Sequence, residues 1–274
     1  MIHTQVSSST WTSWTCDNCG EATLKDLEIL GKLRRVPLEC RCRRQAHLDR
    51  QAEEERWHKL KRIERLKKYS LMDDRFHHST LANWDDDLGS PKLKKTVTRY
   101  VASWPEMKSS NVGLLIHGDP GLGKTYAAFA VANELIQRHQ AVVIAVNAIG
   151  LLSRIKETYS RYGQEAEIDI IRTLENAGLL IIDDLGAEQK TDWAAAMLYQ
   201  IIDSRYRGGK PLFITTNLTL DQLREKLTTT DGVNRTYDRI VEVCLPVKIT
   251  GSSNRAAMAK DKRQQLVDLL RKEE

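Results

Sequence analysis

The chain of 274 residues lacks any apolar run that approaches the ~20 residues needed for a membrane-spanning helix. Its first residues, Met1 to Ser7, contain neither the basic segment nor the apolar stretch of a secretory signal. Hydrophobic residues make up 41% of the chain and charged residues 29%, which is ordinary for a protein with a packed core. We therefore expect a cytoplasmic protein with no membrane partner.

The sequence also lacks a large excess of charge of one sign. The net charge is +5, which permits a nucleic-acid partner without requiring one. The basic excess is concentrated in residues 40–68, where eleven Lys and Arg stand against five Asp and Glu. The rest of the chain is close to neutral.

One segment carries the G-x-x-x-x-G-K-[ST] pattern of a phosphate-binding loop: Gly118, Asp119, Pro120, Gly121, Leu122, Gly123, Lys124 and Thr125. An apolar run precedes it and a helix-favouring stretch begins at Tyr126, which is the strand–turn–helix setting that the pattern requires. The glycines let backbone N–H groups turn toward a polyphosphate, and the helix start adds positive charge. Lys124 can reach the β- and γ-phosphates, and the Thr125 hydroxyl can ligate Mg²⁺. We predict a nucleoside triphosphate site that includes Tyr126.

Two further apolar runs end in polar residues. Residues 179–182 lead into Asp183 and Asp184, and residues 212–214 lead through two threonines into Asn217. The carboxyl ends of buried parallel strands are where ligands bind in such sheets. We predict that Asp183 holds Mg²⁺, that Asp184 orients the attacking water, and that Asn217 bonds this water or the γ-phosphate. Thr219 and Gln222 form a capping box, which leaves Asn217 available to the site.

Four of the five cysteines form two close pairs near the N-terminus, Cys16 with Cys19 and Cys40 with Cys42. Two close pairs across a short segment suit a tetrahedral zinc site, and the metal would supply the folding energy of a segment too small for a core. The C-x-C spacing of the second pair departs from the usual C-x2-C, and His47 is a possible substitute ligand. Disulfides, which cytoplasmic proteins disfavour, and unrelated thiols are the alternatives.

Residues 43–69 contain no Gly or Pro and are dense in helix-favouring residues, so they predict one long helix. Apolar residues recur along it at a spacing of three: Trp57, Leu60, Ile63 and Leu66. Such a narrow stripe fits a solvated connector helix and a docking surface for a protein or nucleic acid equally well.

Beyond the phosphate loop, apolar runs alternate with helical patterns. Strands are expected at 112–116, 141–146, 179–182, 211–215 and 241–245, and helices at 92–103, 125–139, 149–161, 165–177, 192–207 and 220–227. Short apolar strands separated by helices indicate a parallel sheet covered on both faces. The predicted fold is α/β with three layers.

The order of these motifs resembles the AAA+ ATPases of the DnaC/DnaI helicase-loader family. The segments that carry the resemblance are the phosphate loop, Asp-Asp-Leu-Gly-Ala-Glu at 183–188, Thr-Thr-Asn at 215–217, Arg235-x-x-x-Arg239-Ile240 and Gly-Ser-Ser-Asn-Arg at 251–255. The match covers roughly residues 76–258, and the zinc-plus-helix N-terminus resembles the DnaI-like and phage branches. The resemblance implies ATP hydrolysis. The wider class usually has Glu at the second acidic position, so the shorter Asp184 suggests slow turnover.

The resemblance also assigns roles to residues outside the loop. Arg239 would be an arginine finger that reaches the nucleotide of a neighbouring subunit, and Arg255 would sense the nucleotide of its own subunit; Arg235 is a weaker match. For a lone Arg, a surface salt bridge is the ordinary alternative. Thr191 and Trp193 match positions that contact single-stranded DNA, although Trp193 could equally pack within a helix.

The resulting hypothesis is an ATP-dependent loader that assembles with copies of itself, binds a hexameric replicative helicase and delivers it onto single-stranded DNA. The expected organisation is a zinc-binding domain (1–43), a charged connector helix (44–75) and an AAA+ domain (76–274). The alternatives are an IstB-like transposition helper with the same ATPase core, and a zinc-dependent DNA-binding adaptor whose nucleotide site only switches shape.

Overall fold

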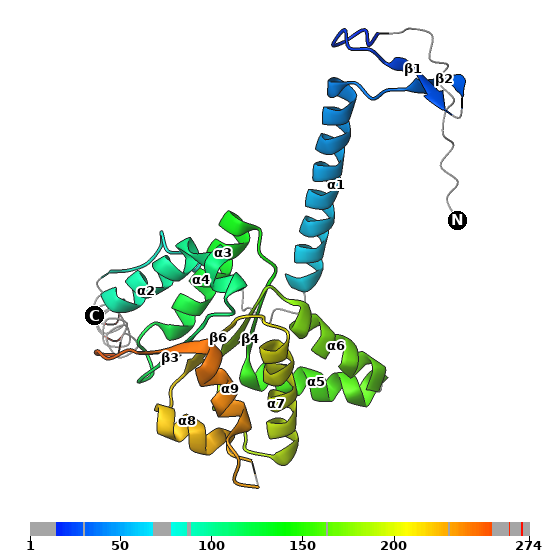
Figure 1. Cartoon of the computed structure of the whole chain (residues 1–274). Helices are drawn as coiled ribbons and strands as arrows, with labels where there is room; N and C mark the ends of the chain where they lie inside the picture. The colour runs from blue at the N-terminus through cyan, green and yellow to red at the C-terminus, as the bar shows by residue number, and fades with distance from the viewer. Residues whose placement is uncertain are drawn as a thin grey trace. The chain divides into compact units, whose positions relative to one another are not determined.

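The computed structural model describes residues 15–29, 31–67, 78–86, 89–162, 164–229, 231–253, 263 and 270 (Figure 1). Within helices, the side chains of residues 56, 58–60, 62–67, 159–162 and 164–167 also lie outside the described part. The chain divides into two compact units, Met1–Lys61 and Arg62–Glu274. The division falls within the long helix α1 (Arg41–Lys67). Each unit is described by itself.

The N-terminal unit contains a two-stranded antiparallel hairpin that the sequence did not predict. β1 (Leu24–Ile29) pairs with β2 (Lys32–Pro37), and Asp26 on β1 forms an ion pair with Arg35 opposite it. Among the described side chains between residues 15 and 61, only those of Thr23 and Cys40 are buried. The unit therefore has no hydrophobic core in this part of the chain.

Helix α1 confirms the long helix predicted for residues 43–69, as far as that segment is described. The Trp57 side chain is 51% exposed, and Lys61 Nζ lies 3.8 Å from the centre of its ring. The other members of the predicted apolar stripe, Leu60, Ile63 and Leu66, have side chains outside the described residues.

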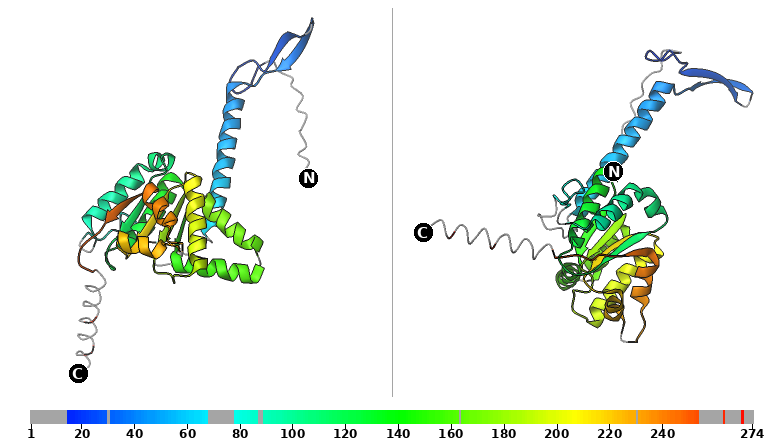
Figure 2. Two further views of the ribbon diagram at one scale, coloured as in Figure 1. Left: turned by 60° about the horizontal axis from the view of Figure 1, so that its bottom comes forward. Right: turned by 90° about the vertical axis from the view of Figure 1, so that its left-hand side faces the viewer.

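A five-stranded parallel sheet forms the centre of the second unit, in the order β4-β5-β6-β3-β7 (Figure 2). Its strands are β3 (Gly113–His117), β4 (Val143–Asn147), β5 (Leu179–Asp183), β6 (Leu212–Thr216) and β7 (Cys244–Lys248). β3 lies between β6 and β7, whereas β4, the next strand along the chain, lies at the far edge. The carboxyl ends of β3, β6 and β5 therefore lie side by side, where ligands of such sheets bind.

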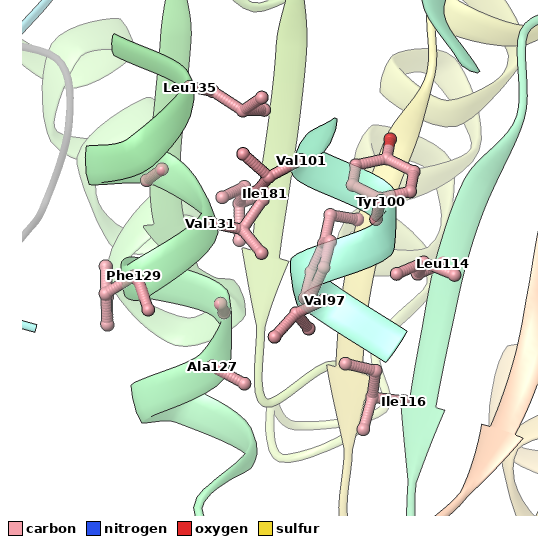
Figure 3. Packing of buried hydrophobic residues seen from close by; sticks show 14 of the residues in the cluster. Val97, Tyr100, Val101, Leu114, Ile116, Ala127, Phe129, Val131, Leu135 and Ile181 are labelled. Carbon is pink, nitrogen blue, oxygen red and sulfur yellow. The ribbon is translucent and has the colours of Figure 1, made fainter. Parts of the chain in front are cut away.

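Helices cover both faces of the sheet, as predicted. One face carries α2 (Pro91–Ala102), α3 (Trp104–Ser109) and α4 (Lys124–His139). The other carries α5 (Ala148–Tyr162), α6 (Gln164–Asn176), α7 (Asp192–Arg207), α8 (Leu220–Leu227) and α9 (Arg235–Val243). Figure 3 shows α2 and α4 packing on the first face, where Val101, Val131 and Ile181 of β5 belong to one buried cluster. Strand side chains alternate between the two cores, which explains the continuous apolar runs.

The strand predicted at 241–245 is wrong in its first half. Residues 241–243 form the last turn of α9, and β7 begins only at Cys244. Thr236 and Ile240, four residues apart, bury one side of α9, and this packing overrides the strand preference of the Val-rich run. β7 continues through Pro246 because it is an edge strand, where a missing N–H is tolerated. Helix α3 was also not predicted.

Within the described part of the chain, no helix combines the length and the apolar character that crossing a membrane requires. Helix α1 has the length, but its sequence is dominated by charged residues.

Candidate nucleotide and zinc sites

The predicted phosphate loop connects the end of β3 to the start of α4. Gly118, Gly121 and Gly123 have φ angles of +144°, +84° and +80°, which residues with a Cβ atom rarely adopt. A Cβ atom at Gly118 would also lie 2.1 Å from the carbonyl oxygen of Ile249, and one at Gly121 would lie 2.2 Å from Ser253 Oγ. The loop therefore needs these glycines both for its own curvature and for its contact with the segment after β7.

The Lys124 side chain is buried and folds into the curve of this loop. Its Nζ donates hydrogen bonds of 2.7 Å to the carbonyl oxygens of Gly118 and Asp119. The ammonium group is thereby held among the loop's backbone groups, where a bound polyphosphate would meet it. The arrangement fits a triphosphate because a fixed cation and a helix N-terminus face the same point.

Tyr126 follows directly in the first turn of α4, and its side chain points away from the loop. The hydroxyl donates to the carbonyl oxygen of Thr80 at 3.0 Å, and the ring meets Trp84 edge-on with centroids 5.4 Å apart. The side chain thus anchors segment 78–86 to α4. A nucleotide contact of Tyr126 stays a prediction.

Asp183 ends β5 beside the phosphate loop, as predicted. Its carboxylate is buried and accepts a hydrogen bond of 2.6 Å from Thr215 Oγ1. Burial raises the pKa of Asp183, and hydrogen bonds from Thr215 and Thr125 oppose this rise. The contact with Thr125 brings together the two side chains predicted to hold Mg²⁺, and carboxylate and hydroxyl oxygens are the hard ligands that this ion prefers.

Asp184 follows with a φ angle of +56°, a left-handed conformation that Asp adopts more readily than most residues. Asn217 Nδ2 donates to Asp184 Oδ1 at 2.5 Å. The capping box of α8 is present, with Thr219 and Gln222 bonding each other's backbone N–H groups. Asn217 therefore takes no part in the cap and contacts the second acid.

Sequence reasoning missed two residues at this site, Thr215 and Ser253. Thr215 forms hydrogen bonds with Asp183 and Asp184, which precede it by 32 and 31 residues in the chain. Ser253, which follows β7 in the chain, lies against Gly121. The signal for Thr215 was a hydroxyl residue directly after the apolar run 212–214, within the Thr-Thr-Asn segment in which only Asn217 was given a role.

Of the three predicted arginines, the two that the structure describes lie elsewhere. Arg239 of α9 contacts α7, where its Nη2 forms an ion pair of 2.7 Å with Asp203 and its guanidinium lies 4.8 Å from the ring centre of Tyr199. Arg235 forms an ion pair with Asp231 in the preceding turn. Arg255 lies outside the described residues. The structure thus groups Lys124, Thr125, Asp183, Asp184 and Asn217, and holds Arg239 on a different surface.

Thr191 and Trp193 lie at the start of α7. Thr191 Oγ1 caps the helix by accepting the N–H of Ala194 at 3.2 Å. Trp193 is 39% exposed, so it is not a core residue. It lines a hollow of about 450 Å³ together with Ile149 and Lys156 of α5.

The four predicted zinc ligands form one cluster. The sulfur atoms of Cys16, Cys19, Cys40 and Cys42 all lie within 4.8 Å of one another, and Cys42 Sγ is 3.4 Å from Cys16 Sγ and 3.3 Å from Cys40 Sγ. Ligands 2.3 Å from a tetrahedral zinc would be about 3.8 Å apart. All five cysteines of the chain are free thiols, and His47 does not belong to this cluster. The donor set fits zinc.

Backbone groups shape the first half of this cluster. The Cys16 carbonyl accepts the N–H of Gly20 at 2.8 Å, which closes a turn that needs the φ of +70° at Gly20. Hydrogen bonds from the N–H groups of Asn18 and Cys19, followed by those from the side chains of Cys42 and Cys40, lower the pKa of Cys16 to about 6. The backbone N–H of Arg41, which stands between the second pair of ligands, donates to the Glu21 carboxylate at 2.6 Å. The two pairs are thereby tied together independently of the sulfur atoms.

Comparison with known proteins decides the family. Residues 43–264, which make up more than half of the chain, match the family of IstB-like ATP binding proteins. The chain belongs to this family.

Relatives of this IstB-like protein include two named replicative helicase loaders. DnaC of Escherichia coli (strain K12) is 28% identical over 122 residues, which cover 44% of this chain and 49% of DnaC. DnaI of Bacillus subtilis (strain 168) is 25% identical over 167 residues, which cover 58% of this chain and 52% of DnaI. The chain spans about half the length of the curated relatives it matches.

The fold of the IstB-like protein is also similar to solved structures. The crystal structure of DnaI superimposes with a TM-score of 0.55 and 26% identity, covering 66% of this chain and 96% of that one. The predicted AAA+ α/β fold is confirmed, and ATP binding is confirmed at the level of the family.

Proposed function

We propose that this protein is an ATP-hydrolysing loader that binds a hexameric replicative helicase and delivers it onto single-stranded DNA. The main support is the arrangement at one sheet edge of Lys124, two carboxylates and Asn217, in a chain whose relatives include the helicase loaders DnaC and DnaI. A phosphate loop with two acidic residues beside it is typical of proteins that cleave nucleoside triphosphates.

In the proposed reaction the phosphate loop and Lys124 hold the triphosphate, while Thr125 and Asp183 hold Mg²⁺. Bound Mg²⁺ would neutralise charge that develops on the β- and γ-phosphate oxygens. Asp184 orients the attacking water, and Asn217 fixes the Asp184 carboxylate from the neighbouring strand. Each role follows from which side chains meet at the carboxyl ends of β3, β5 and β6.

Contact with single-stranded DNA is assigned to the hollow beside Trp193. An exposed indole offers a stacking surface, and Lys156, which lines the same hollow, brings charge of the sign that attracts the phosphate backbone. Thr191, although it caps α7, lies at the rim of the same hollow.

Helicase binding is assigned to the zinc-bearing N-terminal unit and α1, because they contain no part of the nucleotide site. The test is to mix the full chain with the replicative helicase of its own host and measure the mass of the complex with and without ATP. A defined complex whose composition changes with ATP supports the proposal, and absence of any complex with the helicase contradicts it.

Trp57→Ala should weaken helicase binding by about 30-fold, since a large aromatic side chain at the centre of an interface often contributes 2 kcal/mol or more. Leu48→Ala is the matched control, because Leu48 lies on the same helix, is 52% exposed and stands outside the apolar stripe. Titration of the full-length variants against labelled helicase measures both. Equal losses of helicase affinity in the two variants would show that Trp57 is not at the centre of the interface.

The family description itself supports a second candidate, an IstB-like transposition helper. The same ATPase core would then serve a transposase. Binding assays with the host helicase and with a transposase encoded beside the gene separate the two functions. The third alternative, an adaptor that only switches shape, predicts nucleotide binding without turnover, so a steady-state ATPase assay tests it.

Arg239→Ala should still bind ATP but hydrolyse it about a thousandfold more slowly, if Arg239 acts on the nucleotide of a neighbouring subunit. An Asp184→Asn variant should be inactive for a different reason. Mixing the two variants should restore part of the turnover, because some interfaces then pair an intact Arg239 with an intact Asp184. The rate of phosphate release as a function of mixing ratio is the measurement.

Arg207→Ala provides the control for this experiment. Arg207 also forms an ion pair with Asp203, at 2.8 Å, so its removal disturbs the same carboxylate while Arg239 stays in place. Turnover of Arg207→Ala should remain near that of the unmodified protein. Absence of any recovery in mixtures that are shown to co-assemble would place Arg239 outside the reaction of its neighbour.

A further inference from the structure

The Thr215 hydroxyl lies between the side chain of Asp183 and the backbone of Asp184, the two acids at the nucleotide site. Thr215 is on β6, and its side chain is buried. Its Oγ1 donates to Asp183 Oδ1 at 2.6 Å and accepts the backbone N–H of Asp184 at 2.9 Å. A threonine hydroxyl has one proton and two lone pairs, so it can make both bonds at once.

The backbone of Thr215 also forms a hydrogen bond with the turn that contains the two acids. Its carbonyl oxygen accepts the N–H of Leu185 at 2.8 Å. Three consecutive residues of the acidic turn, Asp183 to Leu185, are therefore bonded to one residue of the neighbouring strand. This explains how the turn keeps Asp184 at a φ of +56°, a conformation that costs free energy unless the surroundings fix it.

The orientation of the Asp184 carboxylate depends on this turn. The backbone of Asp184 has a left-handed conformation, which directs its side chain toward Asn217. Asn217 Nδ2 donates a hydrogen bond of 2.5 Å to Asp184 Oδ1. Thr215 and Asn217 are two residues apart on the same strand and its extension. Thr215 bonds the carboxylate of Asp183, the proposed metal ligand, and Asn217 bonds the carboxylate of Asp184, which is proposed to orient water.

We propose that Thr215 is a positioning residue for catalysis: it fixes Asp183 for Mg²⁺ and the Asp184 backbone for water activation, without touching the nucleotide. The inference rests on the proposed ATP hydrolysis, which assigns the two acids their roles. It gives a role to the hydroxyl of Thr215, whereas the Thr-Thr-Asn segment predicted a role in the site only for Asn217.

Thr216 separates this role from ordinary packing. It is the next residue of β6, is equally buried, and also uses its hydroxyl twice, donating to the Leu185 carbonyl oxygen at 2.6 Å and accepting the N–H of Leu218 at 3.1 Å. Its hydroxyl bonds backbone groups and neither acid. Removal of either hydroxyl leaves two polar groups without this partner, but only removal at position 215 takes a bond from the Asp183 carboxylate and from the Asp184 backbone.

The experiment compares Thr215→Val, Thr215→Ser and Thr216→Val in the full-length protein. Thr215→Val should raise the Mg²⁺ concentration for half-maximal turnover about tenfold and lower kcat about tenfold, since a bond to a charged group is among the stronger hydrogen bonds. Tenfold corresponds to about 1.4 kcal/mol. Thr215→Ser should restore both values, and Thr216→Val should leave both near those of the unmodified protein.

A binding measurement provides a readout that does not depend on turnover. The affinity for a fluorescent ATP analogue is measured in Mg²⁺ and again in EDTA. Thr215→Val should lose most of the gain in affinity that Mg²⁺ gives, while its affinity in EDTA stays unchanged. If Thr215→Val does not fold, Thr215→Ala removes the same hydroxyl in a smaller side chain.

Equal effects of Thr215→Val and Thr216→Val, or a loss of affinity in EDTA as large as that in Mg²⁺, would overturn the proposal and leave Thr215 a structural residue. Absence of turnover in the unmodified protein would instead overturn the proposed ATP hydrolysis. In that case the binding measurement still decides whether Thr215 fixes Asp183 for the metal.

Discussion

Lys124→Ala should reduce ATP hydrolysis to background and weaken ATP binding. The ammonium group is buried in the phosphate loop and bonded to the Gly118 and Asp119 carbonyl oxygens, so it is already held where the phosphates are expected. Its removal takes away the only cationic side chain within the loop sequence 118–125. Backbone N–H groups and the helix start would still attract the phosphates, which is why we expect residual binding but no turnover.

The measurement is phosphate release at saturating ATP, together with titration of a fluorescent ATP analogue. Lys108→Ala is the control, because Lys108 is an exposed lysine in the last turn of α3 and has no place in the nucleotide site. Thermal unfolding should show that both variants are folded. ATPase activity of Lys124→Ala close to that of the unmodified protein would reject the nucleotide site as assigned.

The parts of the site that could be predicted from the sequence are those encoded locally. The phosphate loop is one uninterrupted segment, and its glycines are needed at the positions where the chain has φ angles of +84° and +80°. Asp183 and Asp184 could be placed because they end an apolar run, and the carboxyl ends of neighbouring parallel strands meet at one edge. The cap at Thr219 could be read because it involves residues only three apart.

The parts that could not be predicted depend on residues distant in the chain. The bonds of Thr215 to the acids and the ion pair between Asp203 and Arg239 form only once β6, α7 and α9 are packed. The same holds for α9, whose valines favour a strand until Ile240 is buried against the sheet. In the hairpin β1–β2 almost every side chain is exposed, so no alternation of apolar and polar residues marks its strands.

Cys16→Ser should abolish stoichiometric zinc binding and unfold the N-terminal unit. In the described part of this unit Thr23 and Cys40 are the only buried residues, so burial of apolar surface adds little stability there. A structural zinc site contributes on the order of 10 kcal/mol, which is more than the loss of any single packing contact in the second unit would cost. The backbone bonds around Gly20 and Glu21 position the ligands but are too few to hold the segment without metal.

Elemental analysis of the purified protein should give one zinc per chain, and Cys16→Ser should give none. Cys244→Ser is the matched control, because Cys244 is a buried thiol of β7 that lies far along the sequence from the cluster and should leave the zinc content unchanged. Limited proteolysis should cut the Cys16→Ser variant between residues 15 and 40, while ATP binding by the second unit persists. Protein prepared with zinc available but containing no stoichiometric metal would rule out the site, and loss of ATP binding together with zinc would show that the two units do not fold independently.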